Sequence, residues 1–229
     1  MNKLKLSIIS YIIAIILFII YLYYLFMPKL SMDPSEKAIF LLFVCIFNYF
    51  GSLFLTKYLN NNKPLKINLK VSLILYIFLL IDLVIFDFER GEITLIFNNE
   101  SWQSYIDIFV NLVPFKTIKR FFNAFGRINS RYLIYNLLGN LICLMPLSLL
   151  LPKIYKVQNK FFIFTITILL TTLAIEVTQL ITCTGFFDID DIILNASGAL
   201  IAYLILKIKP LARSTSKIFL LERSNYEKN

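Results

Sequence analysis

The chain contains no histidine and only three cysteines among its 229 residues. Without histidine it cannot build a Ser-His-Asp triad, imidazole metal ligands or a histidine proton relay. Cys45, Cys143 and Cys183 lie within or at the end of apolar segments and lack the paired spacing of a disulfide framework or a zinc site. Any chemistry that this chain performs must therefore use carboxylates, amides, hydroxyls or cations.

Charged residues are also scarce, at 16% of the chain, whereas hydrophobic residues make up 59%. Soluble domains hold roughly 45–50% apolar residues, so this composition indicates a membrane protein. A run of about 20 apolar residues spans a bilayer as a helix, and the sequence offers six such runs. They cover residues 6–27, 38–57, 69–87, 132–151, 161–182 and 189–207. The sequence therefore predicts an all-α, polytopic membrane bundle with about six transmembrane helices.

These runs divide the chain into three regions. Residues 1–110 hold three spans and the start of a long outer loop, residues 111–208 hold the other three spans, and residues 209–229 form a basic tail. The first run follows Lys3 and Lys5, as a signal peptide would. It is nevertheless longer than a signal h-region, and no small-residue cleavage site follows it. We interpret it as a retained span.

The distribution of Lys and Arg orients the predicted helices, because these residues are retained on the cytoplasmic side. With the N-terminus inside, the inner segments hold 15 of the 23 basic residues and the outer segments hold 8. We therefore expect both termini in the cytoplasm and the turn around Asp188–Asp191 on the extracytoplasmic face. The net charge of +9 then reflects topology and contact with lipid headgroups. Nothing in the sequence favours nucleic-acid binding.

Polar side chains recur at similar depth in the last three predicted spans. Glu176 and Gln179 lie three residues apart, hence on one helical face. A carboxylate within the bilayer costs on the order of 2.5–3.5 kcal/mol, so Glu176 is expected to have partners. The full set is Asn136, Asn140, Glu176, Gln179, Asp191 and Asn195. Together they predict a buried polar pocket that opens outward, with Asp82 near the end of the third span as a further candidate.

Purely structural roles are open for the same residues. The amides can form hydrogen bonds between helices, and the aspartates of the Asp188–Asp191 turn can cap a helix or remain solvated. Pro146 removes an intrahelical hydrogen bond and is expected to kink the fourth span. Gly198 and Ala202 lie four residues apart and allow a neighbouring backbone to approach closely.

The interval before the fourth span predicts an amphipathic helix that lies in the outer membrane interface. Its apolar side chains recur at spacings of three and four residues, at Phe115, Ile118, Phe122 and Phe125. Lys116, Arg120 and Arg131 are candidates for contact with an anionic group, such as the phosphate of a lipid-linked wall precursor. The alternative is a helix that only covers the bundle and extends its cations to lipid headgroups.

Four motifs follow one another in the C-terminal half. They are NLVPF (Asn111–Phe115), NLLGNLICLMPLSLLLP (Asn136–Pro152), IEVTQL (Ile175–Leu180) and FDIDDIILNASGALIAY (Phe187–Tyr203). In order and spacing they resemble the VanZ-like integral membrane proteins, which are associated with reduced susceptibility to teicoplanin-type glycopeptides. The resemblance implies that the family's motif positions here are Asn136, Asn140, Pro146, Glu176, Gln179, Asp188, Asp191, Asn195 and Gly198. The chain departs from the family pattern at Leu144, Ser148 and Ala202, where Phe, Gly and Gly are usual.

The resemblance implies a multi-pass protein of the bacterial cytoplasmic membrane that reduces susceptibility to teicoplanin-type glycopeptides or lipoglycopeptides through the outward polar site. Its partners would be the bilayer and either the antibiotic or a lipid-linked envelope precursor. The candidate binding residues are Gln179, Asn136, Asn140, Asn195, Asp188, Arg131 and Lys116.

A membrane-embedded enzyme acting on a lipid or lipid-linked cell-wall precursor is the alternative. Glu176 would be its general base and Asp191 a second carboxylate. The one cofactor that the sequence suggests is a divalent cation held by Glu176, Asp188 or Asp191, because such a cation prefers hard oxygen ligands. A small transporter is a third hypothesis, disfavoured because the inner halves of the predicted spans look apolar.

Overall fold

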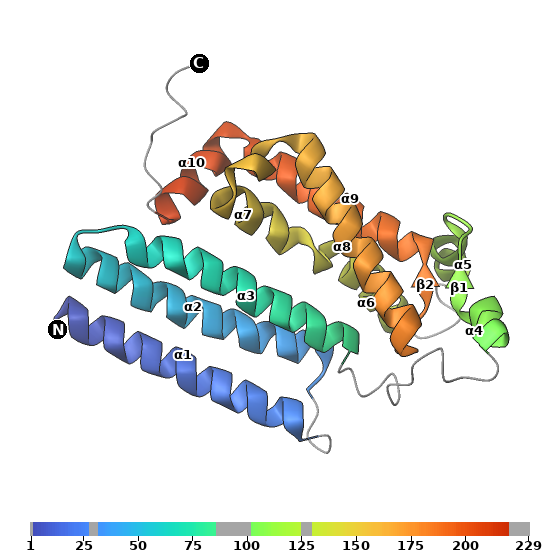
Figure 1. Ribbon diagram of the computed structural model, residues 1–229, viewed down its shortest axis with the longest axis horizontal. Coiled ribbons are helices and arrows are strands. Elements are labelled where there is room, and N and C mark those ends of the chain that lie inside the picture. The colour runs from blue at the N-terminus through green and yellow to red at the C-terminus, as the bar shows by residue number, and fades with distance from the viewer. Residues whose placement is uncertain (1, 28–31, 86–101, 125–129, 220–229) are drawn as a thin grey trace. The chain divides into compact units, whose positions relative to one another are not determined.

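The computed structural model describes residues 2–27, 32–85, 102–124 and 130–219, and within these ranges the chain is almost entirely helical. The helices are α1 (Lys3–Phe26), α2 (Pro34–Leu59), α3 (Lys63–Ile85), α4 (Trp102–Phe109), α5 (Lys116–Ala124), α6 (Ser130–Cys143), α7 (Met145–Ile154), α8 (Phe161–Thr182), α9 (Ile189–Lys207) and α10 (Lys209–Ile218). A 3₁₀ turn, η4, covers Lys156–Asn159, and the short strands β1 (Val110–Asn111) and β2 (Phe187–Asp188) pair in parallel. Figure 1 shows the order of these elements along the chain.

Within the residues that the structure describes, six helical segments are long and apolar enough to cross a membrane. They are Lys3–Phe26, Pro34–Leu59, Lys63–Val84, Asn136–Ile154, Phe161–Thr182 and Ile189–Lys207. Many of their large apolar side chains face outward; Ile15, Ile74 and Leu170, for example, are 59%, 66% and 61% exposed. Lipid covers such surfaces in a membrane protein, whereas a soluble monomer rarely exposes them over large areas. The predicted fold class, all-α and polytopic, is confirmed.

The chain forms two compact units. The first unit contains the residues up to Leu83 together with those from Leu206 onward, and the second contains Val84–Ile205. In the first unit, α1, α2 and α3 lie side by side (Figure 1). Ser7 Oγ on α1 donates a hydrogen bond of 2.8 Å to the Gly51 carbonyl on α2. A Cβ at Gly51 would lie 2.9 Å from the ring of Tyr11, so glycine permits this close approach of the two helices.

A buried ion pair joins α2 and α3 in the first unit. Lys37 Nζ lies 3.0 Å from Asp82 Oδ1, and the side chains are 8% and 1% exposed. The hydroxyl of Tyr21 on α1 donates to the other carboxylate oxygen of Asp82. The three charged and polar groups therefore satisfy one another within this unit, and Asp82, a candidate for the polar pocket, has its partners here.

The fourth predicted span is broken into α6 and α7. Leu144 leaves helical geometry with φ −97° and ψ 2°, and Pro146 occupies the first turn of α7, where its missing N–H costs little. The predicted kink at this proline is therefore present. On the α7 side of the break, Ser148 Oγ donates to the Ala199 carbonyl of α9 at 2.7 Å.

Helix α9 packs closely against the other helices of the second unit. A Cβ placed on Gly198 would lie 1.6 Å from the Leu141 carbonyl oxygen of α6, so only glycine fits at this contact. One turn further along α9, the Tyr203 ring stacks on Phe164 of α8 with centroids 4.4 Å apart. These contacts fix the middle and the C-terminal half of α9 against α6 and α8.

Two helices lie where none was predicted. Helix α4 lies within the long outer loop, and α10 occupies the region read as a basic tail. Pro210 stands in the first turn of α10, where its fixed φ favours helix initiation. Tyr49 on α2 donates a 2.9 Å hydrogen bond to the Ile218 carbonyl at the end of α10. Hydropathy could not find α10 because it is short and polar.

Candidate functional site

The turn between α8 and α9 begins where α8 is capped by Cys183 in the left-handed conformation, with φ 53°. The chain then reverses through β2 and enters α9. Along this turn the Gln179 side chain packs against Gly185, whose added Cβ would lie 3.3 Å from the amide carbon. We call the segment Phe187–Asp191 the acidic turn, because it carries three aspartates.

Glu176 on α8 holds the backbone of the acidic turn. Its side chain is 2% exposed, and Oε2 accepts a 3.0 Å hydrogen bond from the Asp188 N–H. A buried carboxylate needs such donors, because burial without them strongly disfavours the charged form. Glu176 therefore has the partner that its position in a span predicts, although the donor is a backbone group.

Asp188 joins α9 to the loop before α5. Its Oδ1 accepts hydrogen bonds of 2.9 Å from Asn111 Nδ2 and 2.9 Å from the Asp190 N–H. Its Oδ2 accepts a 2.5 Å hydrogen bond from the Thr117 hydroxyl. The bond to the Asp190 N–H is that of an N-cap, and pairing of β1 with β2 sets Asn111 opposite Asp188.

Asp190 caps a helix other than its own. Its side chain is fully buried, and its carboxylate accepts hydrogen bonds from the N–H groups of Phe115, Thr117 and Ile118. The last two measure 2.8 Å and 3.1 Å. The Phe115 N–H directly precedes α5, and the other two N–H groups belong to its first turn, where a negative charge also complements the helix dipole. Asp190 thus fastens α5 to the start of α9.

The expectation that the aspartates remain solvated is wrong for Asp188 and Asp190, which are 6% and 0% exposed. Their capping role is present, but Asp190 caps across the unit. An N-cap is recognised from its position directly before the helix that it caps. The bonds of Asp190 span more than 70 residues of sequence, which no local pattern can reveal.

The Asp191 side chain points toward α6 and not toward α5, because successive helical residues point about 100° apart. Its Oδ1 accepts a hydrogen bond from Asn140 Nδ2 on α6. Asn195, one turn along α9, donates a 2.9 Å hydrogen bond to the Asp191 carbonyl. Asn195 is 3% exposed, and its Oδ1 has no hydrogen-bond partner within the part of the chain that the structure describes.

The structure thus joins most of the candidate residues in pairs. Glu176 bonds to Asp188, and Asn140 and Asn195 bond to Asp191. Asn136 and Gln179 are half-buried on α6 and α8, and no hydrogen bond among the described residues links them to these pairs. Whether the set opens to an outer chamber stays a prediction.

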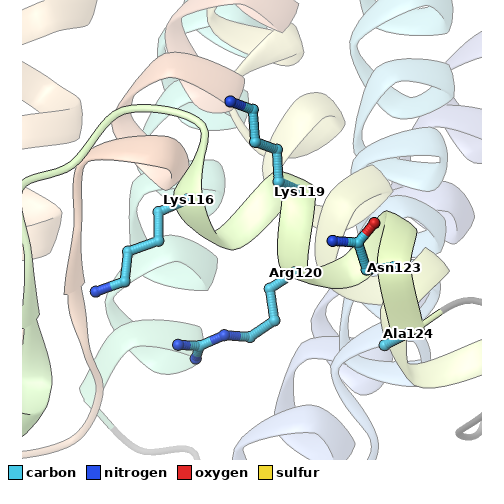
Figure 2. A pocket seen from close by; sticks show the side chains of 5 residues that line it. All are labelled: Lys116, Lys119, Arg120, Asn123 and Ala124. Carbon is cyan, nitrogen blue, oxygen red and sulfur yellow. The ribbon is translucent and has the colours of Figure 1, made fainter.

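Helix α5 displays several exposed cations. Lys116, Lys119, Arg120 and Asn123 follow the spacing i, i+3, i+4, i+7 and so share one face. All four are exposed, and with Ala124 they line an open hollow of about 540 Å³. Figure 2 shows Lys116 and Arg120 extending to one side of the helix and Lys119 to the other. We call Lys116, Lys119, Arg120 and Asn123 the cationic face.

Helix α5 corresponds to the predicted amphipathic helix. Phe115 directly precedes it, Ile118 is half-buried, and Phe122 is 70% exposed. Phe125 lies outside the described residues, as does the side chain of Arg131 at the start of α6. Asn111, Thr117 and Asp190 were not recognised as site residues, and their only signal was that two of them fall within the NLVPF and FDIDD motifs.

The described residues contain no group of three or more acidic or cysteine side chains arranged to hold a metal ion. The carboxylates of Asp188 and Asp190 already accept protein N–H and O–H groups. A divalent cation would have to displace these donors, so the arrangement suits anchoring better than metal binding.

Comparison with protein families agrees with the motifs. The family model described as VanZ/LLP1 matches residues 73–210, which is more than half of the chain. The chain belongs to the VanZ/LLP1 family. The match includes the whole second unit, with the acidic turn and α5, and reaches back into α3. No curated protein and no solved structure gave a significant match.

Proposed function

We propose that this VanZ/LLP1 protein lowers the susceptibility of its host to teicoplanin-type lipoglycopeptides by acting at the extracytoplasmic face of the membrane. The observation that carries the proposal is the buried carboxylate of Asp190, which holds α5 by three backbone N–H groups while the cationic face stays exposed. Because the buried Asp190 carboxylate holds its first turn, α5 presents the cationic face in one fixed orientation.

The charge distribution supports the orientation on which this proposal depends. With 15 basic residues in inner segments and 8 in outer ones, the acidic turn and α5 face outward. Lipoglycopeptides act at that face and combine a peptide core with an acyl chain that enters lipid. A helix with exposed cations and exposed aromatic rings can occupy the same interface and limit access of the drug to its target.

The same geometry favours this function over a lipid-modifying enzyme. A general base needs a carboxylate that can take a proton from substrate. Glu176 Oε2 accepts a backbone N–H and Asp191 Oδ1 accepts the amide of Asn140. Through these hydrogen bonds the two candidate carboxylates position the acidic turn.

The proposal is tested by expressing the full chain in a susceptible bacterium that lacks a VanZ-like gene. We expect a higher inhibitory concentration of teicoplanin than with an empty vector, and a smaller change for vancomycin, which lacks the acyl chain. Immunoblots of membrane fractions establish that the protein is present. Unchanged teicoplanin inhibition at normal abundance would contradict the proposed function.

A further inference from the structure

The cationic face carries charge that no residue in the described part of the chain neutralises. Helix α5 contains no acidic residue, and Lys116, Lys119 and Arg120 make no ion pair or hydrogen bond with described residues. Lys116 and Arg120 lie four residues apart, a spacing at which like charges destabilise a helix. Asp188 and Asp190, the acids bonded to the first turn of the helix and the segment before it, are buried. An external anion would remove this repulsion.

The surroundings of the cationic face are apolar and exposed. Leu112, Phe115 and Phe122 are 65%, 51% and 70% exposed. A site for a free, water-soluble phosphate gains nothing from such neighbours, because exposed aromatic and aliphatic groups are costly in water. In a lipid leaflet the same groups enter the acyl region while the cations remain at the level of the headgroups.

An open hollow along the cationic face provides room for a headgroup. Its volume is about 540 Å³, and the described residues that line it belong to α5. In Figure 2 the Lys116 and Arg120 side chains extend to one side of the helix and Lys119 extends to the other. Asn123 adds an amide that can donate to a phosphate oxygen. Because Asp190 holds the first turn of α5, binding does not first have to order the helix, which lowers its entropic cost.

We propose that the cationic face binds the phosphate of an anionic phospholipid in the leaflet that α5 borders. This names the partner of the surface in the proposed function, and it rests on that function for the side of the membrane on which α5 lies. Each Lys or Arg near an anionic membrane surface contributes about fivefold in affinity at physiological salt. The cations of α5 thus suffice to enrich an anionic lipid over a zwitterionic one.

The test replaces Phe122, which is 70% exposed, by photoreactive p-benzoylphenylalanine in the full chain, in nanodiscs of phosphatidylcholine with one quarter phosphatidylglycerol. Lipid adducts are identified by mass spectrometry after illumination. We expect phosphatidylglycerol adducts in excess of their share of the bilayer. Lys116→Gln/Arg120→Gln should reduce this excess at least about fivefold, whereas Lys116→Arg should retain it.

A matched control removes the same charge elsewhere in the second unit. Lys156 and Lys160 are exposed and precede α8, so Lys156→Gln/Lys160→Gln should leave the adducts at position 122 unchanged. Adducts that follow bilayer composition in the unaltered chain, or an equal loss in both double variants, would overturn the proposal. So would suppression of the adducts by millimolar inorganic phosphate at constant ionic strength, because the face would then bind free phosphate.

The outcome is independent of drug resistance. Lipid enrichment without any change in teicoplanin inhibition would leave the lipid site standing and remove the proposed function. Resistance without lipid enrichment would remove the lipid site and leave the proposed function standing.

Discussion

The carboxylate of Asp190 shows how one residue can serve an element distant in sequence. Capping residues are usually recognised because they precede the helix that they cap. Asp190 lies C-terminal to α5 by more than 60 residues and still supplies the acceptors for its first turn. Its charge is acceptable in a buried position because three N–H groups surround it.

Asp190→Ala should destabilise the second unit by about 2–3 kcal/mol, because it leaves N–H groups of α5 without acceptors. Thermal unfolding of the purified protein in detergent measures the change. Asp107 on α4 is exposed, and Asp107→Ala should change stability by less than about 0.5 kcal/mol. Equal stability of the two variants would show that the carboxylate of Asp190 does not hold α5.

The Lys37–Asp82 pair makes a second prediction at this scale. Removing one partner of a buried pair leaves an uncompensated charge and costs about 3–5 kcal/mol, whereas replacing both by apolar residues is often neutral. Lys37→Met and Asp82→Leu should each lower the abundance and melting temperature of the protein. The double variant should recover both. If the double variant is as unstable as the worse single one, the ion pair is not the source of the loss.

At the scale of helices, the sequence predicts the apolar spans but not the contacts between distant segments. The six apolar segments were predicted because length and hydropathy are local properties, and the break at Leu144 followed from Pro146. Glu176 and Gln179 were placed on one face by their spacing. Their partners were not predictable, because the donor to Glu176 is the backbone of a turn 12 residues away. Hydropathy did not predict helix α10, because this helix is short and polar.

The contact between α6 and α9 gives a prediction at the scale of elements. Gly198→Ala would place a Cβ 1.6 Å from the Leu141 carbonyl oxygen, whereas nothing lies within 4 Å of a Cβ at Gly139. Gly198→Ala should therefore separate the helices, weaken the Asn140–Asp191 bond and lower the melting temperature. Gly139→Ala, also in a helix, should be neutral or stabilise by up to about 1 kcal/mol. A fold that tolerates both changes equally would contradict this packing.

At the scale of the whole molecule, the central expectation is orientation in the membrane. We predict that a cysteine at position 123 reacts with a membrane-impermeant maleimide in intact cells. A cysteine at position 156 should react only after permeabilisation. Both are placed in a chain whose native cysteines are changed to serine, with membrane abundance as the control. The opposite labelling would put α5 in the cytoplasm and exclude action at the outer face.

The measurement that tests the account most directly is teicoplanin inhibition of cells expressing a set of matched variants at equal membrane abundance. Lys116→Gln/Arg120→Gln and Asp190→Asn should each reduce protection, because one removes the cations and the other releases the helix that carries them. Combining them should cause no further loss, and Lys156→Gln/Lys160→Gln should protect like the unaltered chain. Full protection by the Lys116→Gln/Arg120→Gln protein would contradict the claim that the acidic turn serves to present α5.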